Sequence, residues 1–248
     1  DYNVTEYICG TTCLFLNSDF EPFSDIETRK ALLGSIDKKS MENELSDDSI
    51  LAWDIVPEAI ITANKSFREL FPVSERSMLG SAAKWKTTVE QYSAIDFNNS
   101  ILLASDSLKS QSVPYYIISE FEKNLELYCS PVFMNESDFE KSIRAGEESL
   151  FIDTIYGSYN LSEEFLSRIY SVCGFEDDEI DNDIIQMQRC SDLNEKKDMI
   201  RKTENALIDN AYLLPVSYEK KYLLTLNDSK DIYFDPYTES MFFKYAKK

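Results

Sequence analysis

Cysteine is the residue type in this sequence whose spacing first suggests chemistry, since histidine is absent. Cys9 and Cys13 stand four positions apart, a spacing that raises the question of a disulfide or a metal site. In an extended strand their Cα atoms would be about 13 Å apart at ~3.3 Å per residue, too far for a disulfide. A zinc site would need two further ligands. We therefore predict buried thiols and no disulfide between Cys9 and Cys13, in a chain whose cysteine total is odd: Cys9, Cys13, Cys129, Cys173 and Cys190.

The lack of histidine removes several classes of catalysis. Neither a Ser-His-Asp triad nor a Cys-His pair can form, and an HExxH metal site cannot occur. The sequence also lacks the GxxxxGK[ST] and GxGxxG loops whose backbone amides bind phosphates. We therefore expect no nucleotide or metal cofactor, and we interpret the chain as a binding protein rather than an enzyme.

Carboxylate chemistry is harder to exclude, because the sequence contains 45 acidic side chains. Two carboxylates about 5–9.5 Å apart in a cleft would indicate a glycoside hydrolase. The densest acidic run, residues 176–183, lacks the glycine and the ligand spacing of an EF-hand calcium loop. We interpret that run as a solvated loop, and a carboxylate-using hydrolase stays as the alternative function.

The charge balance limits the partners. The net charge is −20, from 25 basic and 45 acidic residues, which repels nucleic-acid phosphates and anionic lipid headgroups. No apolar run approaches the ~18 residues that a membrane-spanning helix needs. No basic segment followed by an apolar stretch marks a signal peptide at the start. The chain opens on Asp1 rather than Met, which suggests a processed protein or a fragment.

Short apolar runs predict the strands. Each run is bounded by polar or turn-forming residues, and Pro131 indicates that its strand lies at a sheet edge or at a bulge. The last run breaks at Glu219-Lys220, which predicts two strands joined there. The predicted strands cover residues 11–17, 100–106, 127–134, 149–157 and 211–226.

Amphipathic segments with N-cap residues alternate with these strands. Ser24-Asp25-Ile26-Glu27 and Ser137-Asp138-Phe139-Glu140 both read as capping boxes, and Asp192 is expected to cap a long helix. The predicted helices cover residues 26–38, 110–126, 138–144, 162–173, 181–190 and 193–210. Strands alternating with helices predict an α/β fold, built on a mixed β-sheet with flanking helices.

Two motifs at opposite ends of the chain resemble family 5 bacterial extracellular solute-binding proteins, the peptide-binding components of ABC importers. The second motif is "ENALIDNAYLLPVSYEKKYLL", followed by the close "DIYFDPYTESMFFKYAKK". The first lies in "LFLNSDFEPFSDIETRKALLGSIDKKSM", where the family pattern is met by Asn17, Pro22, Phe23, Asp25, Arg29, Ala31, Ile36, Asp37 and Lys38.

The resemblance implies a periplasmic-binding-protein-like (type II) second lobe. Family members have two lobes, are roughly twice as long, and close around an extended ligand. It implies a hinge or cross-over strand in residues 1–16, the second lobe in 17–215, and strands that return toward a missing first lobe in 216–248. The helix over residues 26–38 would then be a scaffold behind the hinge.

The resemblance also implies where the ligand lies. The matching loop in peptide-binding relatives reads roughly Trp-x-x-Asp-Tyr, and its Asp pairs with the α-amino group of the ligand. Here Ser158 stands at that Asp, and a hydroxyl cannot pair with an ammonium as a carboxylate does. Ile155 stands at the Trp, while Asp153 and Tyr156 could compensate. The expected ligand-binding residues are Asp153, Tyr156, Ser158, Tyr159 and Asn160.

The resemblance thus predicts an extracytoplasmic solute-binding component of an ABC importer that binds a peptide or peptide-like ligand. The expected partners are this ligand, the membrane subunits of the transporter and the missing first lobe, with no nucleic acid among them. The expected location is the cell surface, with a lipid anchor in the full-length protein. A third possibility is a binding module that has lost its transport ligand.

Overall fold

The computed structural model describes residues 2–62, 65–73, 75–76, 82–91, 101–173, 176–227, 232–238 and 240–243. Among these residues, six strands form one sheet in the order β2-β8-β1-β7-β5-β6. Its strands are β1 (Tyr2–Leu16), β2 (Ser49–Leu51), β5 (Ile101–Ser105), β6 (Ser130–Met134), β7 (Leu150–Tyr156) and β8 (Leu213–Leu226). Two hairpins lie outside this sheet, β3 (Ile61–Thr62) with β4 (Lys65–Ser66), and β9 (Tyr233–Asp235) with β10 (Ser240–Phe242).

The sheet is mixed. Strand β5 runs parallel to β6 and β7, whereas β1 runs antiparallel to β7 and β8. Pro131 lies in β6, at the edge of the sheet, where a missing N–H donor is tolerated. The predicted fold class, a mixed sheet with flanking helices, is confirmed.

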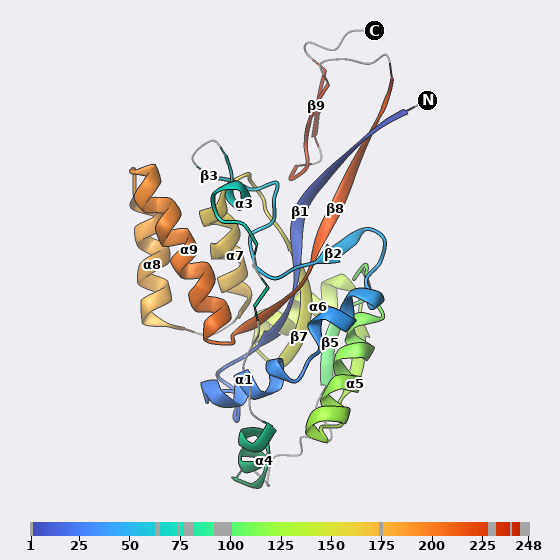
Figure 1. The fold of residues 1–248 in the computed structure, drawn as a ribbon, viewed down its shortest axis with the longest axis vertical. Helices are drawn as coiled ribbons and strands as arrows, with labels where there is room; N and C mark the ends of the chain where they lie inside the picture. Colours follow the sequence, from blue (N-terminus) through green and yellow to red (C-terminus); the bar gives the residue numbers. More distant parts are fainter. Residues whose placement is uncertain are drawn as a thin grey trace.

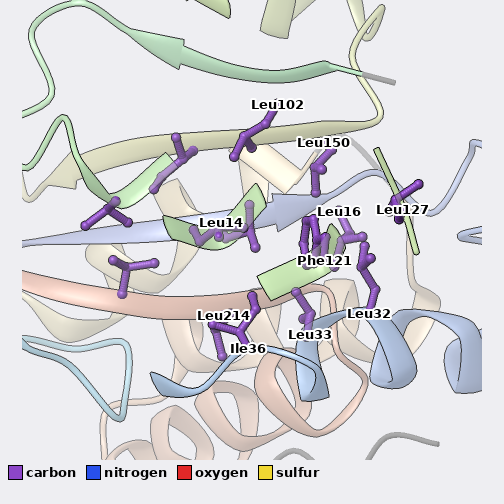
Figure 2. Close-up of a cluster of buried hydrophobic side chains, with 14 of the residues drawn as sticks. Leu14, Leu16, Leu32, Leu33, Ile36, Leu102, Phe121, Leu127, Leu150 and Leu214 are labelled. Atoms are coloured by element: carbon purple, nitrogen blue, oxygen red, sulfur yellow. The ribbon is translucent and has the colours of Figure 1, made fainter. Parts of the chain in front are cut away.

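Successive side chains of each central strand enter two different cores. In β1, Leu14 and Leu16 face one core, and Cys13 and Phe15 face the other. Figure 2 shows the first core, where Leu14 and Leu16 lie among side chains of α1 and α5 such as Leu32, Leu33 and Phe121. Both faces of the sheet are therefore covered, which explains why its strands read as continuous apolar runs.

The helices divide between the two faces. Helices α1 and α5 cover the Leu14 face, while α6, α7, α8 and α9 pack on the Phe15 face. The described helices are α1 (Ile26–Gly34), α2 (Lys38–Met41), α3 (Phe67–Leu70), α4 (Ala82–Gln91), α5 (Val113–Leu125), α6 (Glu136–Ala145), α7 (Ser162–Cys173), α8 (Asp178–Arg189) and α9 (Leu193–Asp209), with a 3₁₀ turn at Glu42–Glu44. None of them combines the length and apolar character that crossing a bilayer requires.

The ends of β1 and β8 form a two-stranded arm that projects beyond the helices (Figure 1). We define the arm as Tyr2–Ile8 of β1 paired with Lys220–Leu226 of β8. The prediction of two strands joined at Glu219-Lys220 was wrong, because β8 runs through this point unbroken. Continuous pairing with β1 keeps these polar residues extended, and register shifts between Ile8 and Gly10 and between Thr12 and Cys13 absorb the irregularity.

The cysteine prediction agrees with this geometry. Cys9 and Cys13 both lie on β1, and both are buried. None of the five cysteines forms a disulfide.

Two N-cap residues differ from prediction by one or two positions, although α1 begins at Ile26 as predicted. Asp25 caps α1, and Asn135 caps α6, where capping boxes had pointed to Ser24 and Ser137. The Ser24 hydroxyl instead donates to Glu21. Helix α1 also ends at Gly34, since Asp37 starts the separate helix α2 by capping it.

The acidic run at residues 176–183 is an ordered helix start in its described part, which corrects the loop interpretation. Asp177 caps α8 and accepts hydrogen bonds from the backbone of Glu179 and Ile180. Acidic side chains in a first helical turn are stabilised by the helix dipole. No group of three or more acidic or cysteine side chains in the described residues could hold a metal ion.

Arg29 connects α1 to the end of α9. It is buried, and its guanidinium donates to the carbonyl of Asn210 at 2.9 and 3.1 Å and to that of Phe23 at 2.6 Å. An arginine that satisfies several backbone carbonyls holds segments that are distant in sequence. Helix α1 therefore acts as a scaffold.

Four charged residues form a second buried tie, which we call the Glu204 cluster: Asp54, Arg68, Arg201 and Glu204. Glu204 on α9 is fully buried, pairs with Arg68 and with Arg201 at 2.6 Å, and accepts hydrogen bonds from two backbone amides after β2. Asp54, also fully buried, lies 3.3 Å from Arg68. Burial opposes ionisation of Glu204, but the two arginines and the amides hold its pKa below the usual value.

Candidate functional site

The order of strands and helices creates a crevice at one end of the sheet. Helix α5, which follows β5, packs on the Leu14 face, while α6, which follows β6, packs on the Phe15 face. Ligands of open α/β sheets bind beyond the carboxyl ends of the strands where successive helices change faces. A cavity of about 780 Å³ lies at this position, between the ends of β5 and β7, and we call it the Asp153 cavity.

The walls of the Asp153 cavity carry charges of both signs. Ser105 and Ser107 follow β5, Glu136 and Glu140 come from α6, and Arg168 from α7. Apolar side chains complete the walls, among them Leu108, Phe139, Ile143, Ile152 and Ile155. A cavity that combines apolar walls with groups of both charges can bind a small ligand that itself carries apolar and charged parts.

Asp153 is the most perturbed acid of this cavity. Its carboxylate accepts one hydrogen bond, from the backbone amide of Thr154 at 2.7 Å. Burial raises the pKa of Asp153 to about 6, and the charges of Glu140 and Glu136 act in the same direction, while Arg168 acts against them. The carboxylate is ionised at neutral pH and would gain from a cationic partner.

Tyr156 closes the cavity next to the arm. Its ring packs directly on Gly10 of β1, where an added Cβ would lie 2.6 Å from the ring carbons. On the ring, Lys221 of β8 sits 4.7 Å from the centroid and donates to the carbonyl of Pro236. Only glycine at position 10 permits this contact, so the sequence at the base of the arm is matched to one wall of the cavity.

A chain of hydroxyl groups leads from the cavity to β8. Thr154, in the cavity wall, lies 2.7 Å from the Thr12 hydroxyl, which donates to Glu219 at 2.8 Å. Glu219 is buried and also accepts from Ser49 and Ser217. Three neighbouring strands, β7, β1 and β8, are thereby linked across their polar groups.

The predicted loop after β7 lies against this cavity without lining it. The Ser158 amide donates to Glu164 at 3.2 Å, and its hydroxyl accepts from Arg168, itself a cavity residue. Asn160 accepts from the amide of Ile61 at 2.8 Å, which ties the loop to β3. Tyr159 is 64% exposed.

The five predicted site residues thus separate into two groups. Asp153 and Tyr156 line the cavity, whereas Ser158, Tyr159 and Asn160 belong to the adjoining loop. Sequence reasoning missed the cations of the walls, Lys109, Arg144 and Arg168. Lys109 comes shortly after β5, and the rule that ligands bind beyond strand ends could have found it once the strand order was known.

A mixed sheet with helices on both faces is a periplasmic-binding-protein-like fold. No protein-family model matches the chain, and no curated protein matches it. Solved structures do. The substrate-binding domain of an oligopeptide ABC transporter from Bacillus anthracis superposes with a TM-score of 0.76 at 19% identity, over 99% of this chain and 50% of that one.

Two further structures are similar in fold. A dipeptide-binding protein from Pseudoalteromonas sp. SM9913, in complex with Met-Leu, has a TM-score of 0.73 at 15% identity, over 100% of this chain and 50% of its own. OppA from Haemophilus influenzae, in complex with RPPGFSPFR, has a TM-score of 0.66 at 17% identity, over 92% and 46%. This chain therefore has the fold of about half of a peptide-binding protein of this kind.

Proposed function

We propose that the chain is the second lobe of the extracytoplasmic peptide-binding component of an ABC importer. The observation that carries this proposal is the Asp153 cavity, whose lining beyond the strand ends includes both carboxylates and cations. A peptide carries an ammonium, a carboxylate and apolar side chains, and each has a complementary group there. The fold that this chain shares with about half the length of each of these structures supports the same proposal.

The arm supports the presence of a first lobe in the whole protein. Its apolar side chains are largely exposed, including Tyr2 and the cross-strand pair Val4 and Leu224, and Tyr233 and Phe242 of the β9–β10 hairpin are exposed as well. Contiguous exposed apolar surface of this kind is typical of an interface. In this proposal residues 1–16 cross between lobes, residues 17–215 form the second lobe, and residues 216–248 return to the first.

The same proposal covers the location and the other partners. The protein acts outside the cytoplasm, is held at the cell surface by a lipid anchor in its full-length form, and delivers ligand to the membrane subunits of the transporter. Ligand is enclosed when the two lobes close around it, as in other hinged binding proteins. The chain alone supplies one wall of the cleft, so it binds short peptides weakly or not at all.

Calorimetry with the full-length, two-lobed protein tests this function, using a set of di- to nonapeptides. We expect one or more peptides to bind, and Asp153→Asn and Tyr159→Ala to weaken binding at least tenfold. Tyr128→Ala, at another exposed tyrosine that does not line the cavity, is the matched control and leaves affinity unchanged. Absence of binding to every peptide, or equally tight binding by the 248-residue chain alone, would contradict the proposal.

Modified peptides separate the role of Asp153 from general binding. If its carboxylate pairs with a peptide ammonium, acetylation of the peptide amino group weakens binding. Binding also weakens below pH 6, as Asp153 gains a proton. If an acetylated peptide binds as tightly as the free one, Asp153 does not pair with the peptide ammonium. The cations of the cavity would then be the charged groups that recognise the peptide.

One observation favours the alternative, a carboxylate-using hydrolase. Asp153, Glu136 and Glu140 share one cavity, and the raised pKa of Asp153 suits a general acid. Incubation with chromogenic glycosides at pH 5–7 tests it. Turnover abolished by Asp153→Asn would establish the hydrolase, and no turnover is expected if the chain serves in binding alone.

A further inference from the structure

A second cavity, of about 400 Å³, lies at the β8 edge of the sheet, and we call it the Lys38 cavity. Leu214 and Pro215 of β8 form part of its wall, just before the segment of β8 that pairs with β2. Helix α2 contributes Lys38, and the segment after β2 contributes Trp53. None of the residues that line it lines the Asp153 cavity.

Lys38 is buried in this wall without an anionic partner. Only 9% of its surface is exposed, and its ammonium lies over the Trp53 ring, 4.7 Å from the centroid. Within the described ranges of the chain, the ammonium makes no hydrogen bond and no ion pair. A buried cation without such partners is strongly disfavoured, so a feature of this kind calls for a binding partner.

The other charged groups of the cavity are already matched. Lys39 pairs with Glu75 at 2.8 Å, and Asp37 accepts from the backbone and hydroxyl of Ser40 at the start of α2. Arg76 lies 2.7 Å from Asp54. Among the described side chains that line this cavity, Lys38 is therefore the charge that an incoming anion would neutralise.

The surroundings of Lys38 define its protonation. Burial lowers the pKa of its ammonium to about 7, the charge of Asp54 acts to raise it, and that of Arg76 acts to lower it. Cys13 is itself buried, which raises the pKa of its thiol far above neutrality, so it stays uncharged. An anion next to Lys38 would restore the charged form.

We propose that the Lys38 cavity binds a small organic carboxylate with an apolar or aromatic body. The carboxylate pairs with Lys38, and the body packs between Trp53 and the aliphatic walls formed by Leu33, Ile36, Ile208 and Leu214. The volume lies within the ~300–1,000 Å³ of ligand pockets. This site is separate from the proposed peptide site and does not depend on that function.

The test is a calorimetric and NMR titration of the 248-residue chain with benzoate at pH 6 and low salt. Benzoate is expected to bind saturably at one site. Benzamide, its neutral analogue, is expected to bind at least tenfold more weakly, and inorganic phosphate likewise, because it has no apolar body. Failure of benzoate to bind, or equal binding of benzamide or phosphate, would overturn the proposal.

Variants and pH locate the site on Lys38. Lys38→Met keeps the length of the side chain and should weaken benzoate binding at least tenfold, while Lys141→Met, on the exposed side of α6, should not. Binding by the unaltered chain should also weaken several-fold between pH 6 and pH 8.5, as the ammonium loses its proton. The pH series tests the role of Lys38 even if Lys38→Met fails to fold. A benzoate affinity that does not change with pH would show that Lys38 does not bind the carboxylate.

Discussion

The Glu204 cluster and the Lys38 cavity treat buried charge in opposite ways. In the cluster, each carboxylate lies against arginines, and Glu204 also receives two backbone amides. In the Lys38 cavity, the ammonium of Lys38 lies over the Trp53 ring, and no carboxylate of the described residues pairs with it. The cluster is complete without a ligand, whereas the Lys38 cavity is completed by one.

Asp153 resembles Lys38 and not the Glu204 cluster, because its charge is buried with little compensation. It is an acid with one backbone hydrogen bond at a cavity wall, and burial shifts its pKa upward as burial shifts that of Lys38 downward. Satisfied charges in this protein hold segments together, and under-compensated ones line the volumes where a ligand fits. Stability measurements should therefore give opposite signs for the two kinds of charge.

The largest effect is expected from Glu204→Gln. The change leaves Arg68 buried without its closest counter-charge, and breaking a buried pair typically costs ~3–5 kcal/mol of stability. Urea unfolding at pH 7 measures it. Glu140→Gln, at an exposed ion pair with Arg144, is the control and should stay within ~0.5 kcal/mol. Equal effects of the two variants would remove the distinction drawn here.

The next effect has the opposite sign. Lys38→Met should raise the free energy of unfolding by ~1–4 kcal/mol, because it removes a buried charge and keeps the volume. The pKa of Lys38 is lowered in the folded chain, so the folded state binds fewer protons than the unfolded state between about pH 7 and pH 10.5. The gain is therefore complete below about pH 7 and declines toward pH 10.5. Thermal unfolding across this range tests it, and a loss of stability at pH 6 would show that Lys38 is already paired.

A smaller gain is expected from Asp153→Asn. Since folding raises the pKa of Asp153 to about 6, the ionised carboxylate is disfavoured, and the stability that its protonated form contributes is lost as pH rises through 6. The variant should be about 1 kcal/mol more stable at pH 8 and indistinguishable from the parent at pH 4, a figure reduced from the full shift because the side chain is partly exposed. Chemical unfolding at both pH values provides the comparison.

The smallest effect should come from Asp25→Ala, at a charge that is satisfied but near the surface. Asp25 caps α1, accepts from Thr28 at 2.8 Å and lies 2.7 Å from Lys84, which lowers its pKa. Losing an N-cap typically costs ~1 kcal/mol. Because the pKa is lowered, this contribution should be present at pH 7 and fade as pH falls through the carboxyl pKa. A pH-independent loss would assign the effect to packing instead.

Local sequence signals were sufficient for much of the fold. The alternating faces of Cys13, Leu14, Phe15 and Leu16 follow from strand geometry. The succession of β5, β6 and β7 along the chain, with helices between them, follows from the periodic apolar patterns. Errors appeared where tertiary pairing overrides local preference. The polar pair Glu219-Lys220 looks like a turn, but β1 pairs along its whole length and holds it extended.

The site was less accessible to sequence reasoning. Asp153 and Tyr156 could be placed near each other because both lie on one predicted strand, in the middle and at the end of β7. The cations facing them come from α6, α7 and the segment after β5, and only the crossing of β7 over to the far side of β5 brings these together. Lys38 matches the family pattern, but nothing in the sequence indicated that it would be buried at a cavity. Its burial depends on Trp53, Arg76 and β8, which are distant in sequence.

The contact between Gly10 and Tyr156 connects the arm to the Asp153 cavity. Gly10 lies just beyond the arm on β1, beside one of the two register shifts with β8, and glycine has the greatest backbone freedom of any residue. Tyr156 presses on that point from the wall of the Asp153 cavity. Because the Tyr156 ring contacts Gly10, we expect bending of the arm at this point to move Tyr156 and to change the shape of the Asp153 cavity.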